Sequence, residues 1–190
     1  AQLEQLAAMR SAFQDGQLEV LENDALTPQA LADWSRQGGD RDGYAYLCLS
    51  SHAEADRQDM RQARLHLSNG AEIAFSDFWQ WRGQGRMLVA LAACETTATQ
   101  GTEEGLSLAS ALVQAGVSGV VGAAWRVDTI QTTKLFNHFN AGLSAGRDPA
   151  RALKDAQRAL RRDNIIDEYT NKPISHPYFW AGFSYVGGVG

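Results

Sequence analysis

Three short apolar segments, at residues 44–50, 87–93 and 119–124, form the strongest pattern in the sequence. The segment at 87–93 is rich in Val, Leu and Ala, and each segment is short and nearly continuous in its apolar character. Such runs are typical of strands that are buried on both faces of a parallel sheet. We therefore expect three buried strands of a parallel sheet.

Apolar residues at intervals of three and four predict helices between and after these strands. One helix is expected over residues 1–13, and the next begins at Thr27-Pro28, where a capping hydroxyl precedes proline. A third is expected over residues 105–115, closed by Gly116 in a left-handed cap. Two further helices are marked by Leu135, Phe136, Phe139 and Leu143 and by Asp148-Pro149, followed by Leu153, Ala156 and Leu160.

Residues 65–67 and 73–75 alternate apolar and polar side chains on either side of Asn69-Gly70, which predicts a β-hairpin. Strands that alternate with helices indicate a mostly parallel α/β sheet, into which this antiparallel hairpin is inserted. Shorter elements are expected at residues 18–21 (strand), 76–81 (helical) and 178–186 (a last strand).

Length and charge restrict the class of protein. The chain has 190 residues and 44% hydrophobic residues, which suits one domain with one core. A net charge of −5 argues against a nucleic-acid surface, and the run Arg158, Arg161, Arg162 is better explained as a solvated helix end. No apolar run approaches the roughly 20 residues of a membrane span, so we expect no membrane contact.

Two cysteines placed in strand contexts do not form a disulfide framework, so we expect a reducing, cytoplasmic setting. The first helix contains Glu4 and Arg10 and is therefore no signal peptide. Because the sequence begins without Met and directly in a helix, we expect residues 1–190 to be one domain taken from a longer polypeptide.

Cys94 and His52 follow two of the predicted strands, at 87–93 and 44–50. Open α/β folds carry their sites at the carboxyl ends of parallel strands. This arrangement places a thiol and a base on the same sheet edge, and a nearby imidazole can generate the reactive thiolate. The alternatives are a small buried thiol at Cys94 and a histidine that only hydrogen-bonds at a strand end. Cys48, inside its strand, is expected to belong to the core.

The other histidines lack such a position. His66 in the hairpin and His138 on a helix are expected to be structural or exposed, and His176 precedes Pro177 in a packing corner. The histidines are scattered and the acids lack the spacing of a calcium loop, so we expect no metal or other cofactor.

Several sequence blocks together resemble the CHAT domain, a bacterial branch of the caspase-like cysteine peptidases. The resemblance runs from about Leu3 to the C-terminus. The sequence blocks that carry it are specific for the family when taken together, whereas any one of them alone is a weak signal. The blocks are LCLSSHA, LVALAACET, EEGLSLASALVQAGVSGVVGAAWRVD, DPARALKDAQRAL and HPYFWAGFSYVG. The resemblance implies a caspase-like three-layer sandwich, a mostly parallel sheet with helices on both faces. It also implies that the sequence lacks the family's usual first strand.

The resemblance implies a Cys–His dyad of Cys94 and His52, which lie 42 residues apart, close to the ~50 residues typical of caspases. It also implies an oxyanion hole built from the backbone N–H groups of Ala53 and Cys94. Caspase relatives usually carry glycine after the histidine, and alanine has access to fewer backbone conformations.

Three acids are candidates for substrate binding. Asp128 follows the strand after the cysteine strand, where caspase relatives build the pocket for the side chain before the cleaved bond. A carboxylate there would favour Arg or Lys, but Asp128 could equally be the N-cap of the next helix. Asp56 in the histidine loop is a weaker candidate, and Glu95 could orient the site or point into a neighbouring helix.

These features predict an endopeptidase that cleaves a protein substrate and is regulated by a partner protein or an adjoining domain. The loops 53–64 and 96–104 are polar and long, so we expect weak activity until a partner orders them. The alternative is an inactive binding module that keeps the fold with a vestigial dyad, and Ala53 is the one feature that favours it.

Overall fold

The computed structural model of the chain divides into two compact units, each of which is described by itself. Unit 1 consists of Ala1–Val20 and Val127–Phe183, and unit 2 of Leu21–Arg126 and Ser184–Gly190. The structure describes residues 2–13, 25–37, 45–50, 52–54, 64–67, 70–80, 87–92, 108–125 and 129–187.

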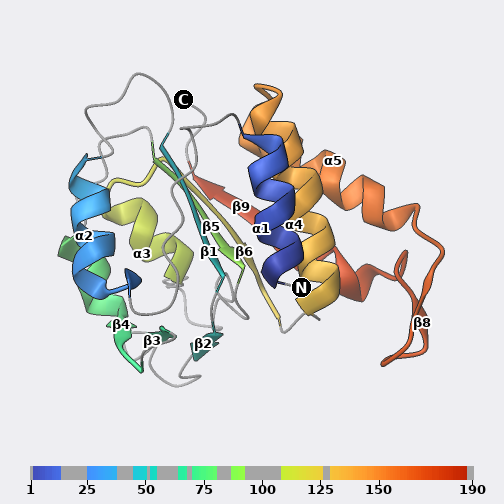
Figure 1. Cartoon of the computed structure of the whole chain (residues 1–190), viewed down its shortest axis with the longest axis horizontal. Helices are drawn as coiled ribbons and strands as arrows, with labels where there is room; N and C mark the ends of the chain where they lie inside the picture. Colours follow the sequence, from blue (N-terminus) through green and yellow to red (C-terminus); the bar gives the residue numbers. More distant parts are fainter. Residues whose placement is uncertain are drawn as a thin grey trace, which may run out of the picture. The chain divides into compact units, whose positions relative to one another are not determined.

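A four-stranded sheet is the centre of the described fold, with the strand order β1-β5-β6-β9 (Figure 1). Its strands are β1 (Ala45–Ser50), β5 (Met87–Ala92), β6 (Gly119–Ala123) and β9 (Phe183–Gly187). β1 pairs parallel with β5, and β5 pairs parallel with β6. The three apolar segments of the sequence are therefore parallel strands, as predicted, and the structure shows that they are neighbours in the sheet.

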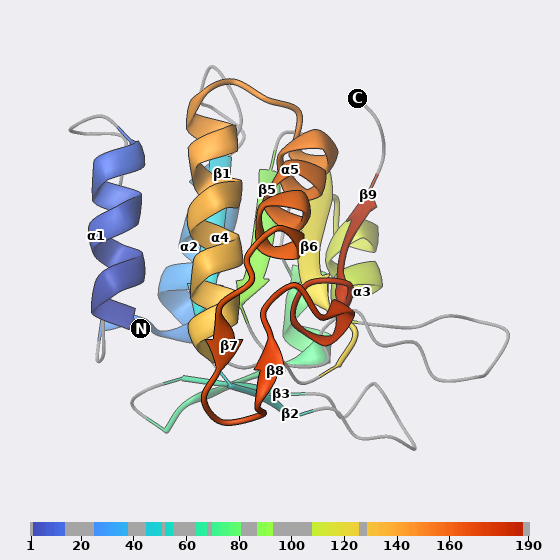
Figure 2. The same cartoon turned by 90° about the vertical axis from the view of Figure 1, so that its right-hand side faces the viewer.

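β9 adds an edge strand of opposite direction. A Cβ atom added to Gly187, at its end, would collide with the carbonyl of Ser118 and with Gly119, at the start of β6. The end of β9 therefore lies beside the start of β6, so the two strands run antiparallel (Figure 2). Gly119 also has no room for a side chain, because the Tyr185 ring lies against it.

The inner strand β5 is buried from Met87 to Leu91. Each residue from Met87 to Leu91 is at most 2% exposed, which means that both faces of the strand are covered. This burial explains why the segment is continuously apolar rather than alternating. The fold is a mixed α/β arrangement with a mostly parallel central sheet and flanking helices, consistent with the predicted caspase-like sandwich.

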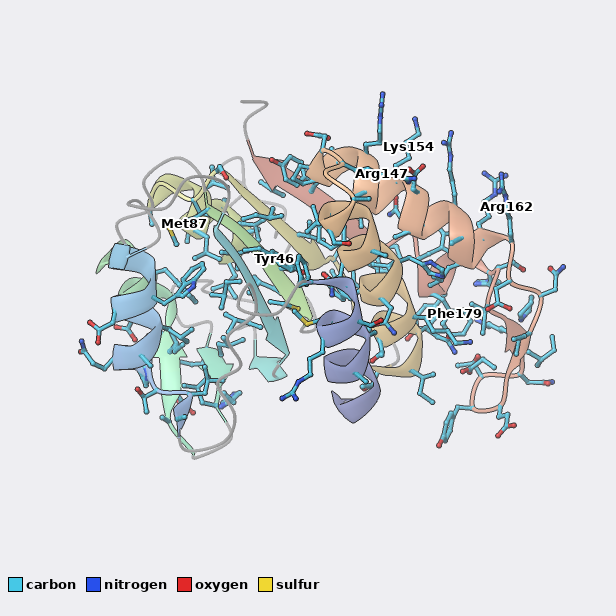
Figure 3. All side chains as sticks on the ribbon, turned by 45° about the horizontal axis from the view of Figure 1, so that its top comes forward. Tyr46, Met87, Arg147, Lys154, Arg162 and Phe179 are labelled. Atoms are coloured by element: carbon cyan, nitrogen blue, oxygen red, sulfur yellow. The ribbon has the colours of Figure 1, made fainter. Side chains whose placement is uncertain are left out.

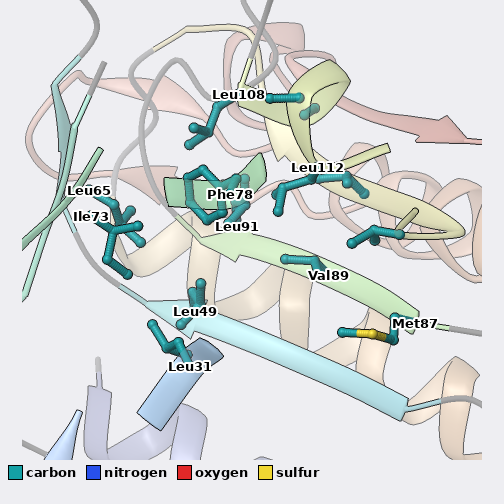
Figure 4. Close-up of a cluster of buried hydrophobic side chains, with 14 of the residues drawn as sticks. Leu31, Leu49, Leu65, Ile73, Phe78, Met87, Val89, Leu91, Leu108 and Leu112 are labelled. Carbon is teal, nitrogen blue, oxygen red and sulfur yellow. The ribbon is translucent and has the colours of Figure 1, made fainter. Parts of the chain in front are cut away.

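Two helices and a 3-10 helix pack against the sheet within unit 2: α2 (Pro28–Gln37), α3 (Leu108–Gln114) and η4 (Phe75–Gln80). Leu31, Phe78 and Leu112, one from each of these elements, are completely buried in the same cluster as Val89 and Leu91 of β5 (Figure 4). Burying a large apolar side chain of this kind contributes about 1.5–3 kcal/mol to folding.

The predicted helix boundaries in unit 2 have the expected chemistry. The Thr27 hydroxyl accepts a 3.1 Å hydrogen bond from the Ala30 N–H, so α2 begins with the predicted cap and proline. At the end of α3, Gly116 has φ +95° and donates to the Val113 carbonyl, while Val117 donates to the Leu112 carbonyl. This pair of bonds is a Schellman motif, which glycine adopts without side-chain strain.

A second, three-stranded antiparallel sheet in unit 2 contains the predicted hairpin. Its strands, in the order β2-β3-β4, are β2 (His52–Glu54), β3 (Arg64–His66) and β4 (Glu72–Ala74). β3 and β4 are the hairpin. β2 was not predicted, since residues 53–64 were expected to be a loop; three residues carry too little alternation to be recognised, and their pairing with β3 is not local.

Unit 1 is built on helices α1 (Gln2–Ala12), α4 (Thr129–Ser144) and α5 (Pro149–Arg161), all predicted from apolar spacing. α4 packs against both α1 and α5, and Figure 2 shows α5 beside α4. α5 begins at the predicted cap, because Asp148 accepts from the Arg151 N–H at 3.1 Å. Its inward residues are buried: Ala152, Leu153, Ala156 and Leu160.

A small hairpin, β7 (Ile166–Asp167) and β8 (Lys172–Pro173), follows α5 and was not predicted. Its turn depends on one carboxylate, because Asp167 accepts from the N–H and the hydroxyl of Thr170 at 2.8 and 2.7 Å. These donors lower the pKa of Asp167.

The predicted final strand at 178–186 is only partly correct. A 3-10 helix, η5 (Pro177–Phe179), occupies its start, capped by His176, whose Nδ1 accepts from the Tyr178 N–H at 3.2 Å. The strand β9 begins only at Phe183. The predicted strand at 18–21 lies outside the described residues.

Candidate functional site

The carboxyl ends of β1 and β5 lie side by side in unit 2. Ser50, the last residue of β1, pairs with Ala92, the last residue of β5. His52 follows Ser50 by two residues, and Cys94 follows Ala92 by two residues. The two strands therefore end at the same level of one sheet edge, each of them two residues before a candidate residue.

The predicted site residues themselves are only partly covered by the structure. The backbone of His52 begins β2, where it pairs with His66. The His52 side chain, and all of Cys94, Glu95, Asp56 and Asp128, lie outside the described part. The dyad, the oxyanion hole and the substrate pocket consequently stay predictions.

Ala53 lies in the middle of β2, opposite Leu65. Among the residues that the structure describes, the one non-glycine residue with positive φ is Asn171, so Ala53 has an ordinary extended backbone. Any residue adopts this conformation without strain. The position therefore does not require the glycine that caspase relatives usually carry there.

The small sheet has one buried and one polar face. Leu65 and Ile73 are 0% and 1% exposed, whereas the alternate residues Arg64, His66 and Glu72 are half-buried or exposed. His66 Nδ1 lies 3.1 Å from Glu72 Oε1, and Arg64 Nε lies 4.0 Å from Glu72 Oε2.

The sequence prediction treated His66 as structural or exposed and missed its pairing with Glu72. A two-residue Asn69-Gly70 turn would place His66 opposite Ile73, whereas the structure pairs His66 with Glu72. The register depends on the length of the loop, and the Asn-Gly motif alone did not give it. His138 is exposed on α4, as predicted.

Trp125 is a second residue that the sequence prediction missed. It lies just after β6, at the carboxyl edge of the sheet, and is 37% exposed. Leu88 of β5 pairs with Gly119 of β6, and Cys94 and Trp125 each lie six residues beyond these partners. A large exposed aromatic side chain at this edge could contact a bound ligand.

Cys48 is chemically unlike a reactive cysteine. Burial raises the pKa of its thiol to about 11, and the side-chain hydrogen bond with Tyr46 only partly opposes this effect. The pKa of Tyr46 is also raised, first by burial and then by the neighbouring Cys48. Figure 3 labels Tyr46 on β1. By its exposed surface Cys48 is only half-buried, so it is not part of the fully buried core, contrary to the prediction, but it lies inside β1 rather than beyond the end of that strand.

Within the described ranges, no group of three or more His, Cys, Asp or Glu side chains could hold a metal ion. None of the helices in that same part of the chain has the length and apolar character needed to cross a bilayer.

Comparison with known families gives one assignment for the chain. The model of the family described as the CHAT domain matches residues 1–188. No match to a curated protein was found. The family match covers nearly the whole chain, including both units and the segments that contain His52 and Cys94.

Proposed function

Because the chain belongs to the CHAT domain family, whose fold is caspase-like and related to peptidases, we propose that it is a cysteine endopeptidase. In this proposal Cys94 is the nucleophile and His52 is the general base. The observation that carries it is the pairing of Ser50 with Ala92. Each candidate follows its paired residue by two positions in the sequence, which supports the proposal that both act at the same sheet edge.

The reaction needs one proton carrier and one nucleophile. His52 takes the proton of the Cys94 thiol, and the thiolate attacks the carbonyl carbon of the peptide bond. Collapse of the tetrahedral intermediate breaks the C–N bond, and the imidazolium gives its proton to the departing amine. Water, activated by His52, then hydrolyses the thioester and regenerates the thiol.

The backbone N–H groups of Ala53 and Cys94 would stabilise the oxyanion of the tetrahedral intermediate. Donors preorganised in this way typically contribute about 2.7–4 kcal/mol to catalysis. The extended backbone of Ala53 supports this part of the proposal, because alanine is unstrained there. It also weakens the feature that favoured a vestigial dyad.

Asp128 is proposed to select Arg or Lys before the cleaved bond, with Asp56 and Glu95 as further substrate-binding acids. The helix α4 begins at Thr129, so Asp128 directly precedes a helix start and could instead cap it. The variant Asp128→Asn separates these roles, because asparagine is an equally good cap but carries no charge.

We also propose that a partner protein or an adjoining domain regulates the peptidase. The basis is the sequence of the segments 55–63, between β2 and β3, and 96–104, which are polar and long enough to rearrange. The isolated chain would then be weakly active, and binding of the regulator would raise kcat by ordering the site.

Cleavage of a peptide library varied at the residue before the cut tests the proposal. Wild type is compared with Cys94→Ala and Asp128→Asn, with and without candidate activating proteins. Cleavage after Arg or Lys that disappears in Cys94→Ala supports both dyad and pocket. Cleavage after other residues that is unchanged in Asp128→Asn would be compatible with the dyad and would refute Asp128 as the residue that selects Arg or Lys.

Thiol labelling distinguishes the peptidase from the inactive binding module. An activated Cys94 reacts with iodoacetamide at neutral pH much faster than an ordinary thiol, and His52→Ala slows it. Cys48, with a pKa of about 11, is the internal reference in the same molecule. Equal labelling of Cys94 in wild type and His52→Ala would favour the binding module.

A further inference from the structure

A row of three residues, which begins with the proposed base His52, crosses the small sheet of unit 2. His52 of β2 lies opposite His66 of β3, and His66 lies opposite Glu72 of β4. Residues that face each other across antiparallel strands share one face of the sheet, with Cβ atoms about 4.5–5.5 Å apart. The position of the proposed base is therefore adjacent to a second histidine, which is adjacent to a carboxylate.

The face that carries this row is the polar one. Leu65 and Ile73, on the opposite face, are buried in the core (Figure 4). The His66 and Glu72 side chains are 36% and 49% exposed. Figure 1 shows that the small sheet lies beyond the carboxyl ends of β1 and β5, which is the edge that leads to Cys94.

The contact between His66 and Glu72 fixes the chemistry that His66 can offer. Nδ1 lies 3.1 Å from Oε1, and an ionised carboxylate can only accept a hydrogen bond, so Nδ1 carries the proton. In a neutral imidazole the other nitrogen, Nε2, is then an acceptor. His66 can therefore accept a hydrogen bond from a neighbouring donor while Glu72 holds its ring.

We propose that His66 and Glu72 form a positioning pair for His52, an inference that rests on the proposed peptidase function. His66 Nε2 accepts a hydrogen bond from the His52 ring N–H and thereby orients that ring toward Cys94. The interaction strengthens when His52 takes the Cys94 proton and becomes an imidazolium. No proton moves to His66 or Glu72, whose role matches that of the orienting carboxylate in serine peptidases.

Other charged groups lie near this row, and the experiment needs a control variant for their electrostatic effect. Arg64 on β3 lies 4.0 Å from Glu72, and Glu54 of β2 is opposite Arg64 in the register. On η4, Asp77 accepts a 2.8 Å hydrogen bond from the Ala74 N–H at the end of β4. Since Arg64 shares the carboxylate of Glu72, the variant Arg64→Gln reports the purely electrostatic influence of this cluster.

The alternative is that His66 and Glu72 form a solvated ion pair that contributes little to stability or function. This alternative predicts that changes at His66 or Glu72 leave the reactivity of Cys94 unaltered. The test is therefore the pH dependence of Cys94 alkylation by iodoacetamide in the full chain, followed by mass spectrometry. It requires no knowledge of the substrate or of an activator.

The variants separate hydrogen bonding from packing. His66→Phe removes the acceptor and keeps a ring, whereas His66→Gln keeps both an acceptor and a donor. We expect His66→Phe and Glu72→Gln to slow Cys94 alkylation at pH 7 by roughly tenfold, which corresponds to about one pKa unit. His66→Gln should recover part of the rate. His138→Phe, at an exposed histidine of α4, should leave it unchanged.

The outcomes distinguish this inference from the proposed function. If Cys94 is activated and depends on His52, but reacts equally in wild type, His66→Phe and Glu72→Gln, the positioning pair is refuted and the dyad stands. If Cys94 is no more reactive than a free thiol and ignores His52→Ala, the peptidase proposal itself fails. Equal losses in His66→Phe and His66→Gln would refute the hydrogen-bond assignment. Thermal melts of each variant confirm that the fold is retained.

Discussion

Cys48 is a residue whose environment determines the reactivity of its thiol. Burial raises its pKa to about 11, so very little thiolate is present at neutral pH. We expect Cys48 to resist iodoacetamide in the folded chain at pH 7.5 and to react fully in denaturant. Peptide mapping by mass spectrometry checks this; fast labelling of Cys48 in the folded state would contradict the burial of its thiol.

The same pKa shift predicts how stability depends on pH. The unfolded thiol ionises near its ordinary pKa, whereas the folded thiol stays neutral up to about 11. The unfolded state thus loses its proton first, so the free energy of unfolding falls as pH rises from about 9 to 11. Tyr46 acts in the same direction. In Cys48→Ala, urea denaturation at pH 8 and pH 10 should show a smaller difference than in wild type.

Trp125 and the proposed nucleophile Cys94 each lie six residues beyond a pair of residues that face each other in β6 and β5. If it holds the apolar part of a substrate, Trp125→Ala should raise KM by roughly three- to tenfold with little change in kcat, because uniform binding is lost. Trp125→Phe should retain most of the affinity. A fall in kcat with unchanged KM would instead assign Trp125 to the organisation of the dyad.

Among the secondary-structure elements, those encoded by local patterns were predictable. The three parallel strands agree with the apolar segments to within one residue at each end. α2 and α5 begin at their predicted caps. β2, β7 and β8 were missed because two or three residues of extended backbone are too short to show a recognisable periodicity.

Only part of the candidate site was predictable from the sequence. That His52 and Cys94 each follow a buried strand could be predicted from the sequence, because strand ends are local features; that the two strands are neighbours is seen only in the structure. The row through His66 and Glu72 could not, since it depends on the pairing of β2 with β3. The pairing of His66 with Glu72 depends on the loop length as well, because a two-residue Asn69-Gly70 turn would place Ile73 opposite His66.

The helix pair α4–α5 in unit 1 makes a close approach at Gly142, where an added Cβ would lie 3.0 Å from the Ala152 Cβ. Alanine usually stabilises a helix relative to glycine by about 1 kcal/mol. Here we expect Gly142→Ala to lower the free energy of unfolding by about 1–3 kcal/mol through overpacking. Urea denaturation measures this, and a gain in stability would contradict it.

A matched glycine separates overpacking from backbone strain. Gly146 ends α4 with φ +75° and has open space around its Cα, so Gly146→Ala should cost about 1–2 kcal/mol from the left-handed conformation alone. Ala152→Gly should recover part of the stability lost in Gly142→Ala. It should recover nothing in Gly146→Ala, because that residue does not contact Ala152.

At the scale of the whole molecule, the chain combines a family assignment with a charge that bears on substrate choice. The CHAT match covers residues 1–188, and the net charge is −5 with an isoelectric point near 5.3. A negative molecule attracts basic peptides at long range, and salt screens this attraction over about 10 Å at 0.1 M. The proposed cleavage after Arg or Lys would therefore gain an electrostatic contribution from the entire chain.

This contribution predicts a salt dependence that local recognition alone would lack. We expect kcat/KM for peptides with several basic residues to fall a few-fold between 50 and 500 mM NaCl, mainly through KM. Peptides with a single Arg before the cut should respond less, because a carboxylate in close contact with the guanidinium is weakly screened. In Asp128→Asn the general salt dependence should persist while the preference for Arg disappears. If both vanish together in this variant, Asp128 alone accounts for the attraction of basic substrates, and the field of the whole chain contributes nothing measurable.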